Sequence, residues 1–422
     1  MFIATKINIL EDRGDRIIVG AEMTRETREL NNSNFARSQT AKTEKLSAHT
    51  LVTLLAALVA FPVNGVLAAN LSVEGQAGLD TNPHRLSSGL DPDAELFGLV
   101  DIRFSNRFDN GVSIEGRSKH AFYPDDDRAD WSRTEFDLGY RGKFELADKK
   151  FGYRLSTDWL DRDKNYVSRT TGEDATFAGE SIVDRYDYEQ LNLNAEISYR
   201  TEASHRLRAR FQRRDKDYAD FSIPGLSNFD YAHDRFRLDL RLQLADEHSL
   251  SLEYGDTRRE YDDRRVEDLN GNEIPGTDLE YDYTEYALGY LYRPNKDFYF
   301  NLEFSFSDRS DNGVGYNDSS YDSLYLSWRK KINQTDEIRA SVTYSVFEYD
   351  TRSFADTALL EEDAFDNEGY LLKLDYKRKL PQNGDENLTL VYELQIDDFD
   401  SSDERYRYDR FKIAVGLRYD LL

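Results

Sequence analysis

The sequence predicts an all-β protein folded as one closed antiparallel transmembrane β-barrel of about sixteen strands. Apolar and polar side chains alternate along many segments, as on strands that have one apolar and one polar face. Proline, which removes a hydrogen bond from a sheet, occurs only 8 times in 422 residues. Short and long connections follow each other between the segments, as in barrels that have turns at one end and loops at the other.

Residues 205–244 show the alternation most clearly and predict a hairpin. One parity is apolar: Leu207, Ala209, Phe211, Phe236, Leu238, Leu240, Leu242 and Leu244. The other parity is polar: Arg206, Arg208, Arg210, Gln212, Arg235, Arg237, Asp239, Arg241 and Gln243. A soluble β-sandwich could bury such an apolar face, so the distinction depends on how often the pattern recurs in the chain.

Fourteen further segments repeat the pattern. The second and third are separated by Asn110-Gly111, a strong hairpin signal. Residues 298–306 are the most apolar, with phenylalanine at four of the five positions on one face. We expect strands of roughly ten to fourteen residues, the length of a tilted membrane-spanning strand. The segments are 71–79, 100–105, 112–119, 136–140, 153–159, 191–199, 250–254, 286–292, 298–306, 324–328, 338–346, 370–376, 388–396 and 411–421.

The connections fall into two classes. The short ones are expected at 109–111, 245–247, 294–296, 333–336 and 381–385. The long ones are expected at 81–94, 162–185, 217–232, 262–278 and 351–366. Short periplasmic turns and long extracellular loops are typical of outer-membrane barrels. Closure also satisfies every backbone group in lipid, which an open sheet does not. We therefore expect a single barrel domain over residues 70–422.

The N-terminal residues predict a targeting segment. Residues 51–60 form a short apolar run after Lys42 and Lys45, and small residues at 66–69 offer a cleavage site. This is the form of a secretory signal peptide, expected over 45–69, and the run is too short to span a membrane as a helix. The alternative is a buried helix of the mature domain. Residues 1–44 are expected to be an unstructured extension, with Met23 as a possible start.

Composition excludes several classes of protein. The 55 basic and 81 acidic residues give a net charge of −26, which argues against a nucleic-acid-binding protein. The absence of cysteine excludes disulfides and thiolate metal sites. Beyond residue 70, no apolar run reaches the 18 or so residues of a membrane-spanning helix.

Two short stretches carry a resemblance to a known class. The alternating segment from Phe411 to Tyr419 resembles the final strand of Gram-negative outer-membrane barrels, although the chain continues to Leu422 instead of ending on an aromatic residue. Asp80-Thr81-Asn82-Pro83 resembles the opening of porin-like barrels of the putative β-barrel porin 2 type and of exopolysaccharide-secretion barrels. The resemblance implies location in the bacterial outer membrane and recognition by the outer-membrane assembly machinery.

Around sixteen strands leave a water-filled interior, so the polar parity would line a pore. Rows of cationic side chains on a pore wall attract anions. The alternative is that they only form ion pairs across the wall, with Glu196, Asp239, Glu253 and Asp158 as partners. The candidate pore-lining residues are Arg206, Arg208, Arg210, Arg235, Arg237, Arg241, Arg154 and Arg141.

Three classes of function remain. The first is a channel for passive transport of small solutes, with anionic solutes as candidates. The second is a conduit for polysaccharide export, and the third is an outer-membrane enzyme or a structural or adhesive barrel. His84 and His233 lack an evident catalytic partner, and His120 faces lipid by parity, so we expect no enzyme and no cofactor. Residues 268–273 lack the ligand spacing of a calcium loop, and no metal site is predicted. Expected partners are outer-membrane lipid and lipopolysaccharide, the transported solute or polysaccharide, and further copies of the chain.

Overall fold

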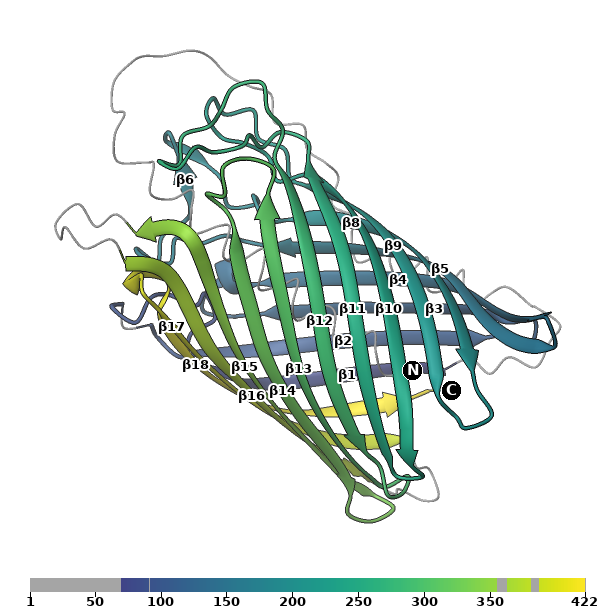
Figure 1. Ribbon diagram of the computed structural model, residues 1–422. Helices are drawn as coiled ribbons and strands as arrows, with labels where there is room; N and C mark the ends of the chain where they lie inside the picture. The colour runs from purple at the N-terminus through teal and green to yellow at the C-terminus, as the bar shows by residue number, and fades with distance from the viewer. Residues whose placement is uncertain (1–69, 91, 355–362, 381–386, 422) are drawn as a thin grey trace. The chain divides into compact units, whose positions relative to one another are not determined.

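The computed structural model describes residues 70–90, 92–354, 363–380 and 387–421. Within these residues, sixteen antiparallel strands pair into one closed barrel, in which each strand neighbours the strands before and after it in the chain (Figure 1). The barrel strands are β1 (Asn70–Asp80), β2 (Glu95–Arg107), β3 (Val112–Phe122), β4 (Trp131–Leu146), β5 (Lys149–Lys164), β8 (Tyr188–Arg200), β9 (Arg206–Tyr218), β10 (Tyr231–Ala245), β11 (His248–Tyr261), β12 (Glu280–Tyr292), β13 (Phe298–Asp311), β14 (Ser319–Lys331), β15 (Asp336–Phe354), β16 (Asp363–Lys379), β17 (Leu388–Ser401) and β18 (Tyr408–Asp420).

The predicted fold class and strand count are confirmed, and each predicted segment falls on one barrel strand. The predicted signal peptide (45–69) and N-terminal extension (1–44) lie outside the described residues. Among the described residues, no helix has the length and apolar character to cross a membrane.

The predicted strand lengths are too short for several strands. β4 and β5 have 16 residues each, and β15 has 19. The alternation marks only the stretch that faces lipid, whereas backbone pairing continues past it through polar residues such as Glu145↔Lys150. The β4–β5 hairpin closes on Ala147 and Asp148, which both have positive φ. Neither residue is glycine or asparagine, so this turn lacks the usual sequence signal of a two-residue hairpin turn.

The outer face of the barrel carries an apolar belt. Leu238 of β10 lies opposite Tyr254 of β11, and Leu252 of β11 lies opposite both Leu240 of β10 and Leu288 of β12. The side chains of Leu238, Leu252 and Leu288 are 40–48% exposed. Water would penalise so much exposed apolar surface, whereas a bilayer would not. At the loop side the same face becomes charged, as in the ion pair of Arg213 with Asp234 (3.2 Å). The apolar belt therefore marks the part of the barrel that lies in the membrane.

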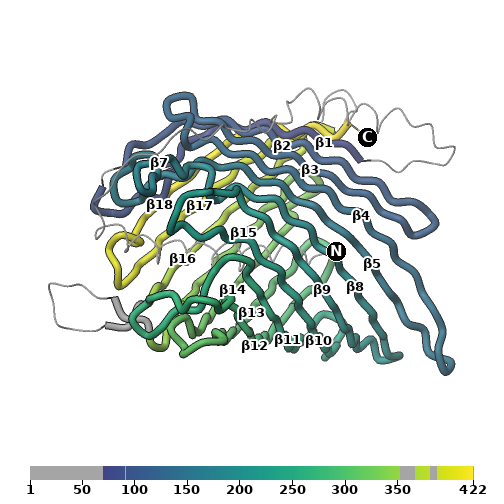
Figure 2. The backbone as a smooth tube through the Cα atoms, turned by 90° about the horizontal axis from the view of Figure 1, so that it is seen from above, coloured from purple at the N-terminus to yellow at the C-terminus, as the bar shows by residue number. Residues whose placement is uncertain are grey.

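The longer connections gather at one end of the barrel and the short turns at the other (Figure 1). Seen from above, the strands follow one another in chain order around the wall (Figure 2). The connection between β5 and β8 contains a small hairpin of its own, β6 (Thr176–Phe177) and β7 (Glu180–Ser181). Single-turn 3₁₀ helices η2 (Asp127–Ala129) and η3 (Glu404–Tyr406) lie in two other connections at the loop end.

The inner face is not polar throughout, which the sequence analysis did not anticipate. Phe97 and Leu99 of β2 point inward and pack with Ala121, Tyr123 and neighbouring apolar side chains in a buried cluster. Lys412 of β18 places its ammonium group 4.2 Å from the centre of the Phe97 ring. Packed apolar side chains therefore cover part of the inner wall beside β1 and β18, and charged side chains dominate the opposite wall.

Candidate functional site

The hairpin β9–β10 places its arginines on the inner face of the barrel. Leu207, Phe211 and Phe236 are 42–50% exposed on the outer face. The alternating residues between them point to the other side, where Arg208, Arg235 and Arg237 are buried. The inward positions predicted from parity are therefore the inward positions of the structure.

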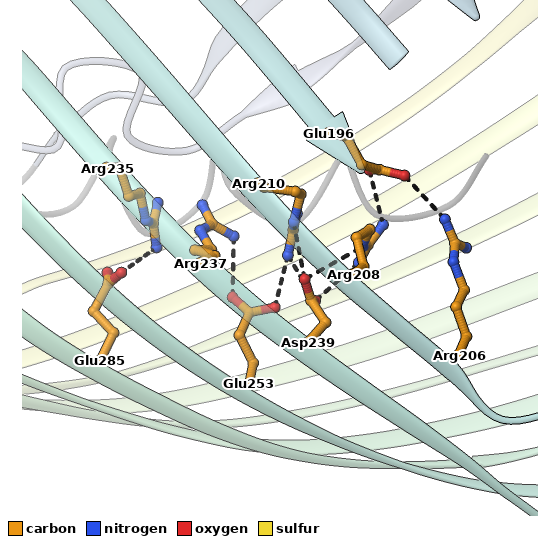
Figure 3. A network of polar contacts seen from close by, with 9 residues as sticks. All are labelled: Glu196, Arg206, Arg208, Arg210, Arg235, Arg237, Asp239, Glu253 and Glu285. Atoms are coloured by element: carbon orange, nitrogen blue, oxygen red, sulfur yellow. Dashed lines mark hydrogen bonds and ion pairs between the residues drawn. The ribbon is translucent and has the colours of Figure 1, made fainter. Parts of the chain in front are cut away.

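Five of the eight candidate arginines belong to ion pairs with four carboxylates (Figure 3). Asp239 is the centre of this arrangement. Arg208 donates to it from Nε (3.2 Å) and Nη2 (2.9 Å), and Arg210 donates from Nε (3.0 Å) and Nη2 (2.7 Å). One carboxylate therefore receives two bidentate guanidinium forks, the strongest geometry for such pairs.

The pairs extend from Asp239 in both directions. On one side, Arg208 Nη1 and Arg206 Nη2 lie 3.4 Å and 3.0 Å from the carboxylate oxygens of Glu196. On the other side, Arg210 and Arg237 contact Glu253 at 2.9 Å and 3.1 Å. We call the set of Glu196, Arg206, Arg208, Arg210, Arg235, Arg237, Asp239, Glu253 and Glu285 the arginine network.

Arg235 completes the arginine network through Glu285 of β12, with Nη2 and Oε2 2.6 Å apart. Five guanidinium groups and four carboxylates give the network a formal charge of 5 − 4 = +1. The predicted partners Glu196, Asp239 and Glu253 are thus found. Glu285 was missed, although its parity beside the outward Tyr286 places it on the inner face. Asp158, the fourth predicted partner, accepts hydrogen bonds from Asn194 (2.8 Å) and Asn192.

The other three candidates lie outside the arginine network. Arg241 is exposed and donates to the Ser249 hydroxyl from Nε (3.1 Å) and Nη2 (2.9 Å). Arg154 of β5 is exposed, and its Nη2 lies 3.7 Å from Asp137. Arg141 of β4 is exposed and stands directly opposite Arg154 in the strand register. These three arginines lie toward the turn end of the barrel, where water reaches them.

A second group of buried cations, which was not among the candidate residues, lies nearer the loop end. Lys216 places Nζ 3.8 Å from the centre of the Tyr188 ring and 4.6 Å from that of Tyr218. Arg309 stacks 4.6 Å from the centre of the Tyr281 ring and donates to the carbonyl oxygen of Asn317. Cation–π contacts stabilise charges that are out of reach of water. Tyrosines at inward positions near the strand ends could have indicated these buried cations from the sequence.

The loops contact one another across the barrel mouth. The guanidinium group of Arg169, in the connection after β5, lies 5.9 Å from the ring of Tyr408 at the start of β18. In the opposite direction, Arg185 stacks on Phe229 of the β9–β10 loop at 4.3 Å and donates to Ser227 O. The loop after β5 therefore links two parts of the rim that are distant in sequence.

Asp268 forms its hydrogen bonds within its own loop. The Asp268 carboxylate accepts backbone N–H groups from Asn270 (2.8 Å) and Asn272 (2.9 Å), and the Asn272 hydrogen bonds lower its pKa. Within the described ranges, no group of three or more His, Cys, Asp or Glu side chains is arranged to hold a metal ion. Glu361 and Glu362 lie outside the described residues.

The histidines occupy three different settings. His120 is on the outer face, as parity predicted, with Nε2 2.8 Å from the Ser118 hydroxyl. His233 is buried on the inner wall. His84 donates from Nε2 to Asp126 Oδ2 (2.9 Å), which joins the β1–β2 loop to the β3–β4 loop.

The His84–Asp126 contact gives a prediction for pH dependence. Burial lowers the pKa of His84, and the neighbouring Asp126 offsets only part of this. Burial also raises the pKa of Asp126, but hydrogen bonds from Arg128 and His84 outweigh it and hold this pKa at about 2. His84 is protonated less readily in the joined loops than in separated loops. As pH falls below about 6.5, the ordinary pKa of histidine, the joined loops therefore bind fewer protons than the separated loops. We expect the contact to be most stable above that pH and to weaken as pH falls.

Amide hydrogen exchange of residues 82–90 at pH 7.5 and pH 5, corrected for intrinsic rates, measures this effect. Protection should fall at pH 5. A His84→Gln variant, which keeps a donor but does not titrate, should lose most of the difference between the two pH values. Equal protection at both pH values in the parent protein would contradict the prediction.

A closed barrel with an even number of antiparallel strands, an apolar outer belt and charged inner wall is the architecture of bacterial outer-membrane proteins. The protein accordingly has the fold of a bacterial outer-membrane β-barrel. No protein-family model and no curated protein matches the sequence.

Solved structures of similar shape include proteins of three bacteria. OccAB1 of Acinetobacter baumannii is 10% identical, with 86% of this chain and 99% of that chain covered and a TM-score of 0.43. OccK2 of Pseudomonas aeruginosa is 11% identical, with 84% and 98% covered and a TM-score of 0.41. The trimer form of OmpT of Vibrio cholerae is 10% identical, with 84% and 100% covered and a TM-score of 0.40. These likenesses are distant and concern the fold alone.

Proposed function

We propose that the protein is an outer-membrane channel through which small solutes diffuse, with a preference for anions. The observation that carries the proposal is the surplus of positive charge on one inner wall. The arginine network has one more guanidinium group than carboxylates, and Arg241 adds a further charge whose hydrogen-bond partner is a neutral hydroxyl. Barrels of this strand number leave an aqueous interior, in which fixed cations attract anions.

The ion pairs and the selectivity are compatible. Pairing holds each guanidinium group in one position, so that the surplus charge is presented by a rigid wall and not by mobile side chains. Arg206 is 35% exposed, whereas Arg208 and Arg237 are about 10% or less. Arg206 also stands directly opposite Arg241 on the neighbouring strand. We propose that this Arg206–Arg241 pair is where a passing anion meets positive charge in water.

Reconstitution into planar lipid bilayers tests the proposal. The parent protein should show open-channel conductance and a reversal potential, in a salt gradient, of the sign given by anion preference. Arg241→Gln should reduce the anion-to-cation permeability ratio. A partly exposed charge contributes about 0.2–1 kcal/mol, so the expected reduction is roughly 1.5- to 5-fold.

Arg258→Gln is the matched control, because Arg258 lies on the outer face and pairs with Glu260 at 2.9 Å and with Glu280. It removes the same charge from the protein without touching the inner wall, and the permeability ratio should stay at the parent value. Folded parent protein without conductance would refute the channel. Conductance with an unchanged ratio in Arg241→Gln would refute the assigned source of selectivity.

In this function the barrel transports solutes and catalyses no reaction. Its outer apolar belt contacts outer-membrane lipid, and the charged outer margin above the belt contacts lipopolysaccharide. Insertion by the outer-membrane assembly machinery and association into homo-oligomers belong to the same proposal, as does removal of residues 45–69 as a signal peptide.

A further inference from the structure

The seam between the first and last barrel strands has little side-chain packing of its own. β1 and β18 pair from Ser72↔Asp420 to Asp80↔Lys412, and three of these nine pairs contain a glycine. At Gly78 an added Cβ would lie 2.1 Å from the carbonyl oxygen of Ile413, so the two backbones approach very closely. Cross-strand side-chain pairs are a main source of stability between strands, and here they are reduced.

A buried polar group compensates at the loop end of this seam. Asp80, the last residue of β1, is fully buried. Its carboxylate accepts a bidentate fork from Arg410 of β18, with Nε 2.8 Å from Oδ1, and a hydrogen bond from the Tyr123 hydroxyl (3.0 Å). Arg410 also lies 3.7 Å from Asp397 of β17. The first strand is therefore tied by charge to both of the last two.

Asn82 makes a second link across the same seam. It is buried, and its side-chain amide donates to the carbonyl oxygens of Asp409 (3.2 Å) and Leu86 (3.0 Å). Its Oδ1 accepts the backbone N–H of Leu86 (2.7 Å). Thr81 lies between these two residues and forms two hydrogen bonds with Phe411. The backbone N–H of Thr81 donates to the carbonyl oxygen of Phe411 (2.9 Å), and the backbone N–H of Phe411 donates to the Thr81 hydroxyl (2.9 Å). Each residue of the segment from Asp80 to Asn82 thus bonds to the start of β18.

We propose that Asp80, Asn82, Tyr123 and Arg410 form a seam clasp that holds the barrel closed. Asp80 and Arg410 are 330 residues apart in the sequence. Every other pair of neighbouring barrel strands is consecutive in the chain. Pairing β1 with β18 therefore carries the largest loss of loop-closure entropy in barrel formation. A charge pair buried beneath the loops favours the closed barrel where strand packing contributes least. The role of the Asp80-Thr81-Asn82-Pro83 segment is closure, independent of the solute that the barrel carries.

Amide hydrogen exchange of the folded, detergent-solubilised full chain tests the clasp. Asp80→Asn keeps the shape of the side chain and removes its charge. Exchange of β1 and β18 amides should accelerate by roughly tenfold or more, the factor that corresponds to the loss of a charged hydrogen bond. Amides of β12 and β13, on the opposite wall, should keep the parent rate. Asn82→Ala should give the same pattern with an acceleration of roughly threefold. It tests the clasp if Asp80→Asn does not fold.

Asp101→Asn is the matched control. Asp101 is likewise buried on the inner face of β2. It pairs with two arginines, Arg103 and Arg117 (both Nη2–Oδ2 2.6 Å), and neither of them is on β18. This variant should leave exchange in β18 unchanged. A disulfide in Ala77→Cys/Val415→Cys, whose positions are directly opposite across the seam, should restore slow exchange to Asp80→Asn. Parent-like exchange of β1 and β18 in both clasp variants, or equal acceleration in Asp101→Asn, would overturn the proposal.

Discussion

Replacing Asp239 by asparagine is expected to raise the anion preference of the proposed channel and to lower the stability of the barrel. Asp239 receives bidentate forks from Arg208 and Arg210, so Asp239→Asn removes the negative charge that two guanidinium groups share. The formal charge of the arginine network rises from +1 to +2. The permeability ratio of anions to cations should increase by roughly two- to fivefold, which corresponds to about 0.4–1 kcal/mol for one further positive charge on the inner wall.

The same substitution should cost about 2–3 kcal/mol in the free energy of unfolding. Breaking a buried ion pair costs about 3–5 kcal/mol when the remaining charge has no other partner. Here Arg208 keeps Glu196 and Arg210 keeps Glu253, which reduces the loss. Unfolding in urea, followed by tryptophan fluorescence and gel mobility of the unheated protein, measures this effect.

Asp282→Asn is the control for both measurements. It makes the same change in net charge at an exposed residue of the outer face of β12, between Arg258 and Ser310 in the register. It should alter neither the reversal potential nor the unfolding midpoint appreciably. If Asp239→Asn also left the reversal potential at the parent value, the arginine network would have a purely structural role.

Replacing Leu302 by arginine should destabilise the barrel by about 2–4 kcal/mol, the cost of a cation on the lipid face near the bilayer midplane. Leu302 is the central residue of the five outward apolar positions of β13 and is 36% exposed. Position 302 lies in the apolar belt, so an arginine there would move from water into the hydrocarbon of the bilayer when the barrel folds. Folding into vesicles of a short-chain phosphatidylcholine, titrated with urea, provides the measurement.

The adjacent residue separates lipid exposure from other causes. Asn301→Arg adds the same side chain one position away, on the inner face of the same strand. It should cost less than about 1 kcal/mol, as expected for a substitution that remains in water. A similar loss in both variants would show that the two faces of β13 do not meet different solvents.

The strands and their faces were predictable because alternation is a local property of the chain. Residues 205–244 assign each arginine to a face without knowledge of its neighbours. The pairing of Arg235 with Glu285 was not predictable in the same way, because it depends on the register from β10 through β11 to β12. The seam contact of Asp80 with Arg410 depends on closure of the whole barrel. Register and closure are non-local, and no pattern within one segment records them.

The inner positions that differ from expectation have a physical reason as well. Phe97 and Leu99 have the parity of pore-lining residues, yet they pack against Tyr123 and Ala414. Parity reports the direction of a side chain, and it does not report whether loops or other side chains cover it. The same limit applies to Lys216 and Arg309. The aromatic rings that they contact, those of Tyr188 and Tyr281, belong to other strands.

The burial of the arginine network also bears on ionic strength. The Debye length shrinks from about 10 Å at 0.1 M salt to about 3 Å at 1 M, and screening acts on charges that water surrounds. Arg206 and Arg241 stand in that position, whereas Arg208 and Arg237 are enclosed by protein. The electric field of Arg206 and Arg241 in the lumen is therefore strong in dilute salt and weak in concentrated salt. The field of Arg208 and Arg237 depends little on the salt concentration.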